Sequence, residues 1–173
     1  KAPLFGRDED AILKFHYSIS PDTAKYVAQL MDEQGIKPEF EMFDIADVKY
    51  LNRLAKDGTA KTPYWVSMLF NGNGTIPTPD MMLAATRALP DNSLLNVIGI
   101  VAAQFPMLAM AMILGHHVRV GLEDNVFYAP RELAQGNGQM VERVVRLARE
   151  LGRPIATPEQ ARKMMGLGAP RAY

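Results

Sequence analysis

The chain has 173 residues, of which 48% are hydrophobic and 22% are charged, a composition typical of one globular domain that can bury a core. Its 19 basic and 19 acidic residues balance to zero formal charge without long runs of either sign, so we expect neither a nucleic-acid partner nor a membrane partner. The absence of cysteine excludes disulfides, thiolate catalysis and cysteine-ligated zinc, and favours a cytoplasmic protein. The first residue is Lys1, with neither an initiator methionine nor an apolar signal core, which predicts that the chain is part of a longer product.

Three segments share a helix-start signature, in which a hydroxyl residue caps the helix, proline takes the first position and an acid follows. They are Ser20-Pro21-Asp22, Thr78-Pro79-Asp80 and Thr157-Pro158-Glu159. Gln160 adds the partner of a capping box at the last one. The signatures predict helices over residues 21–34, 80–88 and 159–167.

Strand-like and helical patterns alternate along the rest of the chain. Acidic and apolar residues alternate over residues 39–44 with the period of a strand. Further strands are predicted over residues 64–70, 95–101 and 118–122, and further helices over residues 46–56, 106–114 and 139–151. The apolar stretch 94–115 is long enough for a membrane span, but Asn96, Gln104 and Pro106 interrupt it, so we interpret it as a buried strand and a core helix.

Repeated strand–helix units with short connections predict a parallel sheet covered by helices, either a doubly wound sheet or a (β/α)8 TIM barrel. Four strands cannot close a barrel. No linker interrupts the pattern, so we expect residues 1–173 to form a single domain.

Residues 117–125 (HVRVGLEDN) are the strongest candidate for a site, because ligands bind at the carboxyl ends of strands in both folds. Strand alternation would place Arg119, Gly121 and Glu123 on one face and apolar side chains on the other. A buried arginine and carboxylate are costly unless a partner, a metal or a ligand compensates. Spacing alone leaves open a purely structural ion pair between Arg119 and either Glu123 or Asp124.

A second acidic strand end and two weaker features accompany this segment. Glu39, Glu41 and Asp44 can contact a ligand, cap the following helix or remain solvated. The glycine-rich loop at residues 70–74 is a flexible turn that can approach a ligand, and Asn137 is expected to cap the next helix.

The RVGLEDN segment at residues 119–125 resembles the last-strand signature of the β-keto acid cleavage enzymes, which include 3-keto-5-aminohexanoate cleavage enzyme. Residues 38–44 (PEFEMFD) resemble the Pro-Glu-x-Glu-x-Phe-Asp strand of the family, and residues 152–162 (GRPIATPEQAR) resemble its closing segment. The resemblance covers residues 36–167. It implies a (β/α)8 TIM barrel of which this chain is the C-terminal half, with about the last four units and a terminal helix.

The resemblance also implies residue roles. In the family, a β-keto acid reacts with acetyl-CoA to give acetoacetate and a new acyl-CoA, and zinc polarises the keto group. Glu123 matches the zinc-binding glutamate, Asp124 the catalytic carboxylate and Arg119 the arginine that orients it, while Glu41 is a candidate substrate contact.

The remaining zinc ligands of the family are a His-x-His pair on an early strand, and this chain has no such motif. Strand geometry would send His116 and His117 to opposite faces, and His16 precedes the first predicted helix, so we expect none of them to bind zinc. The isolated chain is therefore expected to be inactive, because one carboxylate cannot retain zinc.

Three rival interpretations remain from the sequence. One is another TIM-barrel enzyme of the aldolase or carbon–carbon lyase kind, and the second is a non-catalytic barrel in which Arg119 clamps a carboxylate or a phosphate without zinc. The third is an interaction module whose open sheet edges are covered by a partner. We expect the intact enzyme to be a homotetramer, with residues 157–173 near a subunit contact.

Overall fold

The computed structural model describes residues 19–71 and 74–169, which form a four-stranded parallel sheet. Lys1 and His16 lie outside the described residues, as do residues 72–73 of the glycine-rich loop and the last four residues of the segment expected near a subunit contact. The strands follow one another across the sheet in the order β1 (Glu39–Met42), β2 (Tyr64–Phe70), β3 (Ser93–Gly99) and β4 (His117–Arg119). Their parallel, sequential pairing confirms the predicted alternation of strands and helices.

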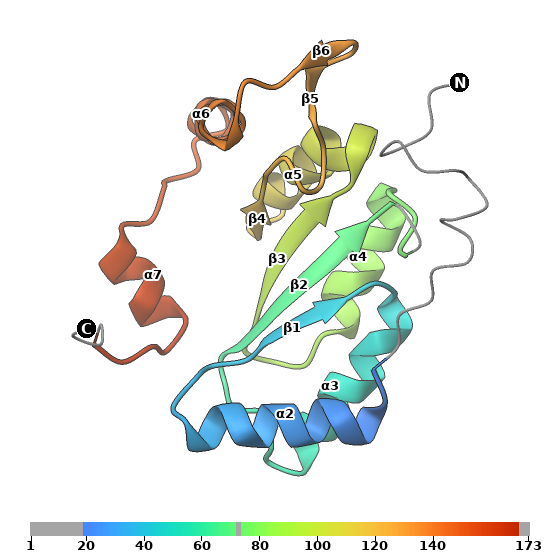
Figure 1. Ribbon diagram of the computed structural model, residues 1–173, viewed down its shortest axis with the longest axis vertical. Coiled ribbons are helices and arrows are strands. Elements are labelled where there is room, and N and C mark those ends of the chain that lie inside the picture. The colour runs from blue at the N-terminus through green and yellow to red at the C-terminus, as the bar shows by residue number, and fades with distance from the viewer. Residues whose placement is uncertain (1–18, 72–73, 170–173) are drawn as a thin grey trace.

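Helices cover one face of this sheet (Figure 1). The helices are α2 (Pro21–Glu33), α3 (Val48–Lys56), α4 (Pro79–Ala88), α5 (Gln104–Ile113), α6 (Asn137–Glu150) and α7 (Pro158–Met164), with 3-10 turns η2 (Ile45–Asp47) and η3 (Val101–Ala103). Of these, α3, α4 and α5 pack on the covered face, whereas α7 stands apart from the sheet. The core lies between the sheet and α3, α4 and α5, where Val66, Met68 and Phe70 of β2 are fully buried. Val144 and Ala148 extend this core onto α6.

The three helix-start signatures are confirmed. The hydroxyls of Ser20 and Thr78 each accept the main-chain N–H three residues further on, at 3.1 and 3.3 Å. Thr157 and Gln160 satisfy each other's main-chain N–H groups, as a capping box requires.

The long apolar stretch of the sequence forms β3, η3 and α5, as expected. A side chain at Gly99 would place its Cβ 2.5 Å from the Cα of Gln104, so only glycine lets α5 begin this close to the end of β3. Within residues 19–71 and 74–169, no helix is long and apolar enough to cross a membrane.

The connections at the carboxyl ends of the strands are hydrogen-bonded to one another in sequence. Thr75 N–H donates to Phe43 O at 2.7 Å, Ile100 N–H donates to Phe70 O at 3.0 Å, and Val101 N–H donates to Asp124 O at 2.7 Å. The connection after β2 also lies so close to the end of β1 that a Cβ on Gly74 would overlap the carbonyl oxygen of Phe43. These bonds join the four strand ends into one rim.

Beyond Arg119 the structure differs from the sequence prediction. The strand expected over residues 118–122 ends at Arg119, and residues 122–124 form a turn instead. An antiparallel hairpin that was not predicted follows, formed by β5 (Phe127–Ala129) and β6 (Glu132–Leu133). The guanidinium of Arg143 on α6 lies between the rings of Phe105 and Tyr128, at 3.8 and 4.9 Å from their centres, and so fixes the hairpin to α6.

The terminal helix packs less than the sequence suggested. α7 ends at Met164 rather than at residue 167, and none of its residues is buried. Met164, on its expected apolar side, is 42% exposed. The following Gly166 approaches the ring of Pro63, where an added Cβ would lie 3.1 Å from Cδ.

Candidate active site at the carboxyl end of the sheet

Strand register places the predicted polar residues on the face of the sheet opposite the helices. Glu41 pairs with Ser67, Ser67 pairs with Asn96, and Asn96 pairs with His117. Residues two apart on a strand share a face, so Arg119 lies on the same side as these four. The charged ends of β1 and β4 therefore lie on one surface.

Arg119 contacts three carboxylates. Its Nη2 donates to Glu123 Oε2 at 2.8 Å, its Nη1 lies 3.4 Å from Glu41 Oε1, and its Nε lies 3.6 Å from Asp124 Oδ2. The structure thus brings together all four residues named as candidates from the sequence. We call these four residues the Arg119 cluster.

Asp124 is the buried member of the Arg119 cluster. Only 4% of the residue is exposed, and its Oδ2 is buried without a hydrogen-bond partner. Burial raises the pKa of the Asp124 carboxyl; the guanidinium of Arg119 opposes this shift, and the neighbouring Glu123 and Glu41 add to it. A carboxylate that is harder to keep ionised is a stronger proton acceptor, which suits it to general-base chemistry.

Glu123 reaches the cluster in a different way from the one expected. Because β4 ends at Arg119, strand alternation does not place Glu123 on the inner face; it extends from the turn that follows, and its side chain is 82% exposed. Asp124, the next residue, turns inward instead. The Glu123 carboxylate is therefore open to solvent, whereas the Asp124 carboxylate is enclosed.

The described residues do not form a metal centre by themselves. In residues 19–71 and 74–169, no group of three or more histidine, aspartate or glutamate side chains is placed to hold a metal ion. His116 Nε2 is 2.9 Å from Thr86 Oγ1, and the His117 ring packs 5.3 Å from Trp65. Burial lowers the pKa of both histidines. Glu123 offers the most exposed carboxylate of the Arg119 cluster, and a zinc ion needs three or more protein ligands.

The other two acids of β1 and its end have structural partners. Glu39 is exposed yet accepts a hydrogen bond from the Ser67 hydroxyl, which in turn accepts one from Asn96 at 2.9 Å. Asp44 caps η2 by accepting from Ala46 N–H at 2.8 Å. The helix-capping interpretation is confirmed for Asp44, whereas Glu39 is exposed to solvent and also accepts the Ser67 hydroxyl.

Three residues near the cluster were missed or misread from the sequence. Asn137 does not cap α6, whose N-cap is Gly136; its Oδ1 accepts from Leu122 N–H at 2.9 Å. Gln104 is fully buried against residues 121–125, and Val101 holds a left-handed backbone with φ of 54° beside Asp124. No sequence pattern signals these contacts, because each joins residues 15 to 23 positions apart in the chain.

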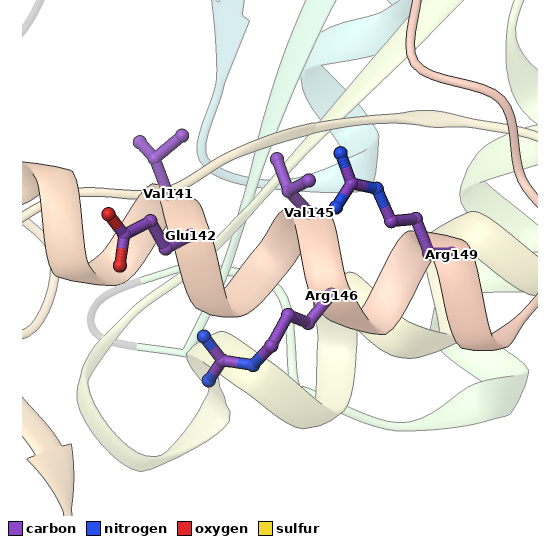
Figure 2. A pocket seen from close by; sticks show the side chains of 5 residues that line it. All are labelled: Val141, Glu142, Val145, Arg146 and Arg149. Carbon is purple, nitrogen blue, oxygen red and sulfur yellow. The ribbon is translucent and has the colours of Figure 1, made fainter.

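A shallow hollow on α6 lies on a different element from the Arg119 cluster. Figure 2 shows its lining side chains, which come from successive turns of this one helix: Val141, Glu142, Val145, Arg146 and Arg149. It contains one carboxylate and no enclosed polar group, so we place the candidate site at the cluster.

Comparison with known proteins decides the family. Residues 8–167 match the sequence profile of the beta-keto acid cleavage enzymes. The chain belongs to this family. The matched segment includes all four residues of the Arg119 cluster.

Characterised relatives agree with this assignment. The chain is 43% identical over 95% of its length to a 3-keto-5-aminohexanoate cleavage enzyme from Acetoanaerobium sticklandii, and 40% identical over 84% of its length to one from Fusobacterium nucleatum. A 3-oxoadipate:acetyl-CoA acetyltransferase from Cupriavidus necator is 32% identical over 87% of the chain. These alignments cover 56%, 53% and 55% of the relatives, so the chain spans about half the length of the relatives it matches.

Proposed function

We propose that this chain is the C-terminal half of an enzyme that transfers an acyl group from a β-keto acid to coenzyme A at the expense of acetyl-CoA. The carbon between the keto and carboxylate groups forms a bond to the acetyl carbonyl carbon, and the thioester bond between that acetyl carbon and the CoA sulfur breaks. The bond from the same carbon to the keto carbon of the substrate then breaks, and the released acyl group bonds to the freed CoA sulfur. The products are acetoacetate and a new acyl-CoA. The buried Asp124 carboxyl against Arg119 is the observation that carries this proposal.

A closed barrel is the architecture we propose for the intact protein. Four sequential parallel strands with helices on one face correspond to half of a (β/α)8 TIM barrel, and the chain has about half the length of its relatives. In such a barrel the face that carries Glu41 and Arg119 would point inward, at the carboxyl end where these enzymes bind ligands. The missing strands would then cover a surface whose charges are already arranged.

Each member of the Arg119 cluster receives a role in this proposal. Asp124 accepts a proton from the substrate, because its carboxyl is enclosed and its Oδ2 has no hydrogen bond to give up. Arg119 orients this carboxylate and balances the charge of the bound anion. Glu41, which contacts Arg119 from β1 on the same face of the sheet, is the proposed substrate contact.

Glu123 fits as one ligand of a zinc ion, because its carboxylate is exposed beside Arg119 rather than enclosed. The histidine ligands would come from chain outside residues 1–173. When bound, the ion would supply Lewis-acid polarisation of the keto group.

The test is an assay of the full-length protein with acetyl-CoA and a panel of β-keto acids, including 3-keto-5-aminohexanoate and 3-oxoadipate. Acetoacetate and the matching acyl-CoA should form together in equal amounts. A protein that binds β-keto acids without forming either product would instead support a carboxylate-binding barrel. Cleavage that does not depend on acetyl-CoA would support a different carbon–carbon lyase.

We also propose that the intact enzyme is a cytoplasmic homotetramer in which the segment from residue 157 onward lies near a subunit contact. The exposed α7, with its partly uncovered Met164, supports this placement. Light scattering of the full-length protein tests it, since a monomer at assay concentration would contradict it.

A further inference from the structure

We propose that Asn137 and Gln104 are positioning residues that hold the turn carrying Glu123 and Asp124, so that the Asp124 carboxyl faces Arg119. We call residues 121–125 the site loop. The proposal rests on the function proposed above. It concerns how the chain positions the Asp124 carboxyl, whose Oδ2 makes no hydrogen bond.

Gln104 ties the two ends of the site loop together from the first turn of α5. Its Nε2 donates to Gly121 O at 3.2 Å, and its Oε1 accepts from Asn125 Nδ2 at 3.5 Å. The Gln104 residue is fully buried. A buried amide needs both kinds of partner, and here the site loop supplies them.

Asn137 holds the middle of the site loop from the start of α6. Its Oδ1 accepts from Leu122 N–H at 2.9 Å, directly before Glu123. It also lies close against the chain, since a Cβ on Gly121 would be 3.2 Å from this oxygen. An asparagine at this helix position therefore serves the loop and leaves its own helix uncapped.

Val101 holds Asp124 itself. Its N–H donates to Asp124 O at 2.7 Å, and its φ of 54° is a conformation that branched side chains rarely adopt. Such strain persists only where the surroundings over-determine the backbone, and it is concentrated at functional sites. The main chain of Asp124 is thus fixed by a neighbouring connection.

These contacts come from three separate elements and bear on the main chain of the site loop and on the Asn125 side chain. Oδ2 of Asp124, in contrast, is buried without a hydrogen bond. The direction of this carboxyl is therefore set by its ion pair with Arg119 and by the backbone of the site loop. This arrangement leaves the oxygen free for a proton while keeping it in place, which is the requirement for a positioned general base.

The experiment compares substitutions at Asn137 with a matched control on the same helix. Asn137→Ala removes the bond to Leu122, whereas Asn137→Asp keeps an acceptor oxygen there. Gln139→Ala is the control, because Gln139 Oε1 likewise accepts a main-chain N–H from before the helix, that of Gln135 at 2.8 Å, but outside the site loop. Gln104→Met keeps the side-chain length and removes both of its bonds.

In the full-length enzyme, Asn137→Ala should lower kcat by about tenfold or more with KM within about twofold, because a small displacement of a reacting group costs up to about 10²-fold in rate. Asn137→Asp should restore most of this loss, and Gln139→Ala should leave kcat unchanged. Gln104→Met should repeat the kcat loss if it folds. Unchanged kcat in Asn137→Ala, or an equal loss in Gln139→Ala, would overturn the proposal.

Amide hydrogen exchange provides a readout that does not depend on activity. Asn137→Ala should speed exchange at Leu122 and its neighbours in the site loop while leaving the sheet unchanged, and Gln139→Ala should not. An intact wild-type protein that releases no acetoacetate would refute the proposed function alone, whereas unaltered exchange in Asn137→Ala would refute the positioning role alone.

Discussion

The site loop and the terminal segment around α7 both come after β4 in the chain, yet they are held in opposite ways. In the site loop, Asp124 and Asn125 are buried, and contacts arrive from the β3–α5 connection, α5 and α6. In α7, no residue is buried, and Arg162 bonds to Gly168 of the same segment. The site loop is thus held by other elements of this chain, whereas the described residues leave α7 exposed.

The largest effect is expected from Asp124→Asn, which tests whether the site loop carries the group that accepts the proton. The amide cannot accept the proton, so kcat in the full-length enzyme should fall by about 10²- to 10⁴-fold, the usual contribution of a general base. Zinc content, measured by elemental analysis, should stay at the wild-type level. Near-normal acetoacetate release would sink the assignment of Asp124.

Glu123→Gln probes the exposed side of the same loop and should fail differently. A neutral amide is a much weaker zinc ligand than a carboxylate, so zinc content and activity should fall together. Elemental analysis and steady-state acetoacetate release, measured on the same preparation, check this. Full zinc content in Glu123→Gln would contradict the ligand role.

A pair of stability measurements sharpens the contrast between the two segments. Asn125→Ala removes a buried amide that bonds to Phe127 N–H at 3.0 Å and to Phe127 O at 2.8 Å, so we expect a loss of about 1–3 kcal/mol in the free energy of unfolding. Thr157→Ala removes only the cap of the exposed α7, at a cost of about 1 kcal/mol or less. Urea unfolding of the full-length protein compares them, and an equal loss would end the distinction.

The smallest effect concerns pH. Burial lowers the pKa of His116, and the charges of His117 and Arg153 lower it further, so the folded state binds fewer protons than the unfolded state. The free energy of unfolding should therefore not depend on the titration of His116 above the unfolded pKa of about 6.5, and it should decrease as the pH falls below that value. His116→Gln, which keeps a partner for Thr86, should weaken this dependence in urea unfolding between about pH 7.5 and about pH 5.5. An unchanged slope would show that the dependence has another source.

Local rules in the sequence predicted much of the fold. The hydroxyl–proline–acid triplets at Ser20, Thr78 and Thr157 specify helix starts through contacts within three residues, and the structure contains all three caps. Strand alternation also predicted that Arg119 would lie on the face opposite the apolar side chains of its strand, and the register of the sheet places Glu41 on this same face.

Contacts over longer separations could not be predicted in the same way. Alternation failed at Glu123 because β4 stops at Arg119, and the turn that follows depends on Gln104 and Asn137, which belong to other elements. The hairpin of β5 and β6 escaped notice because its strands have three and two residues, too few to show a period. The sequence therefore identified the side chains of the candidate site but not the hydrogen bonds that hold them in place.

The hydrogen-bonded rim of strand ends limits how this scaffold can evolve and how it can be engineered. Each connection uses its neighbour as part of its own fold, and Gly74 leaves no room for a side chain against Phe43. Exchanging a single connection with that of a relative would therefore disturb the next one along, as far as the bond between Val101 and Asp124. New substrate preferences should arise in this scaffold by changing side chains on a retained rim, and grafts should succeed only when the connections are moved together.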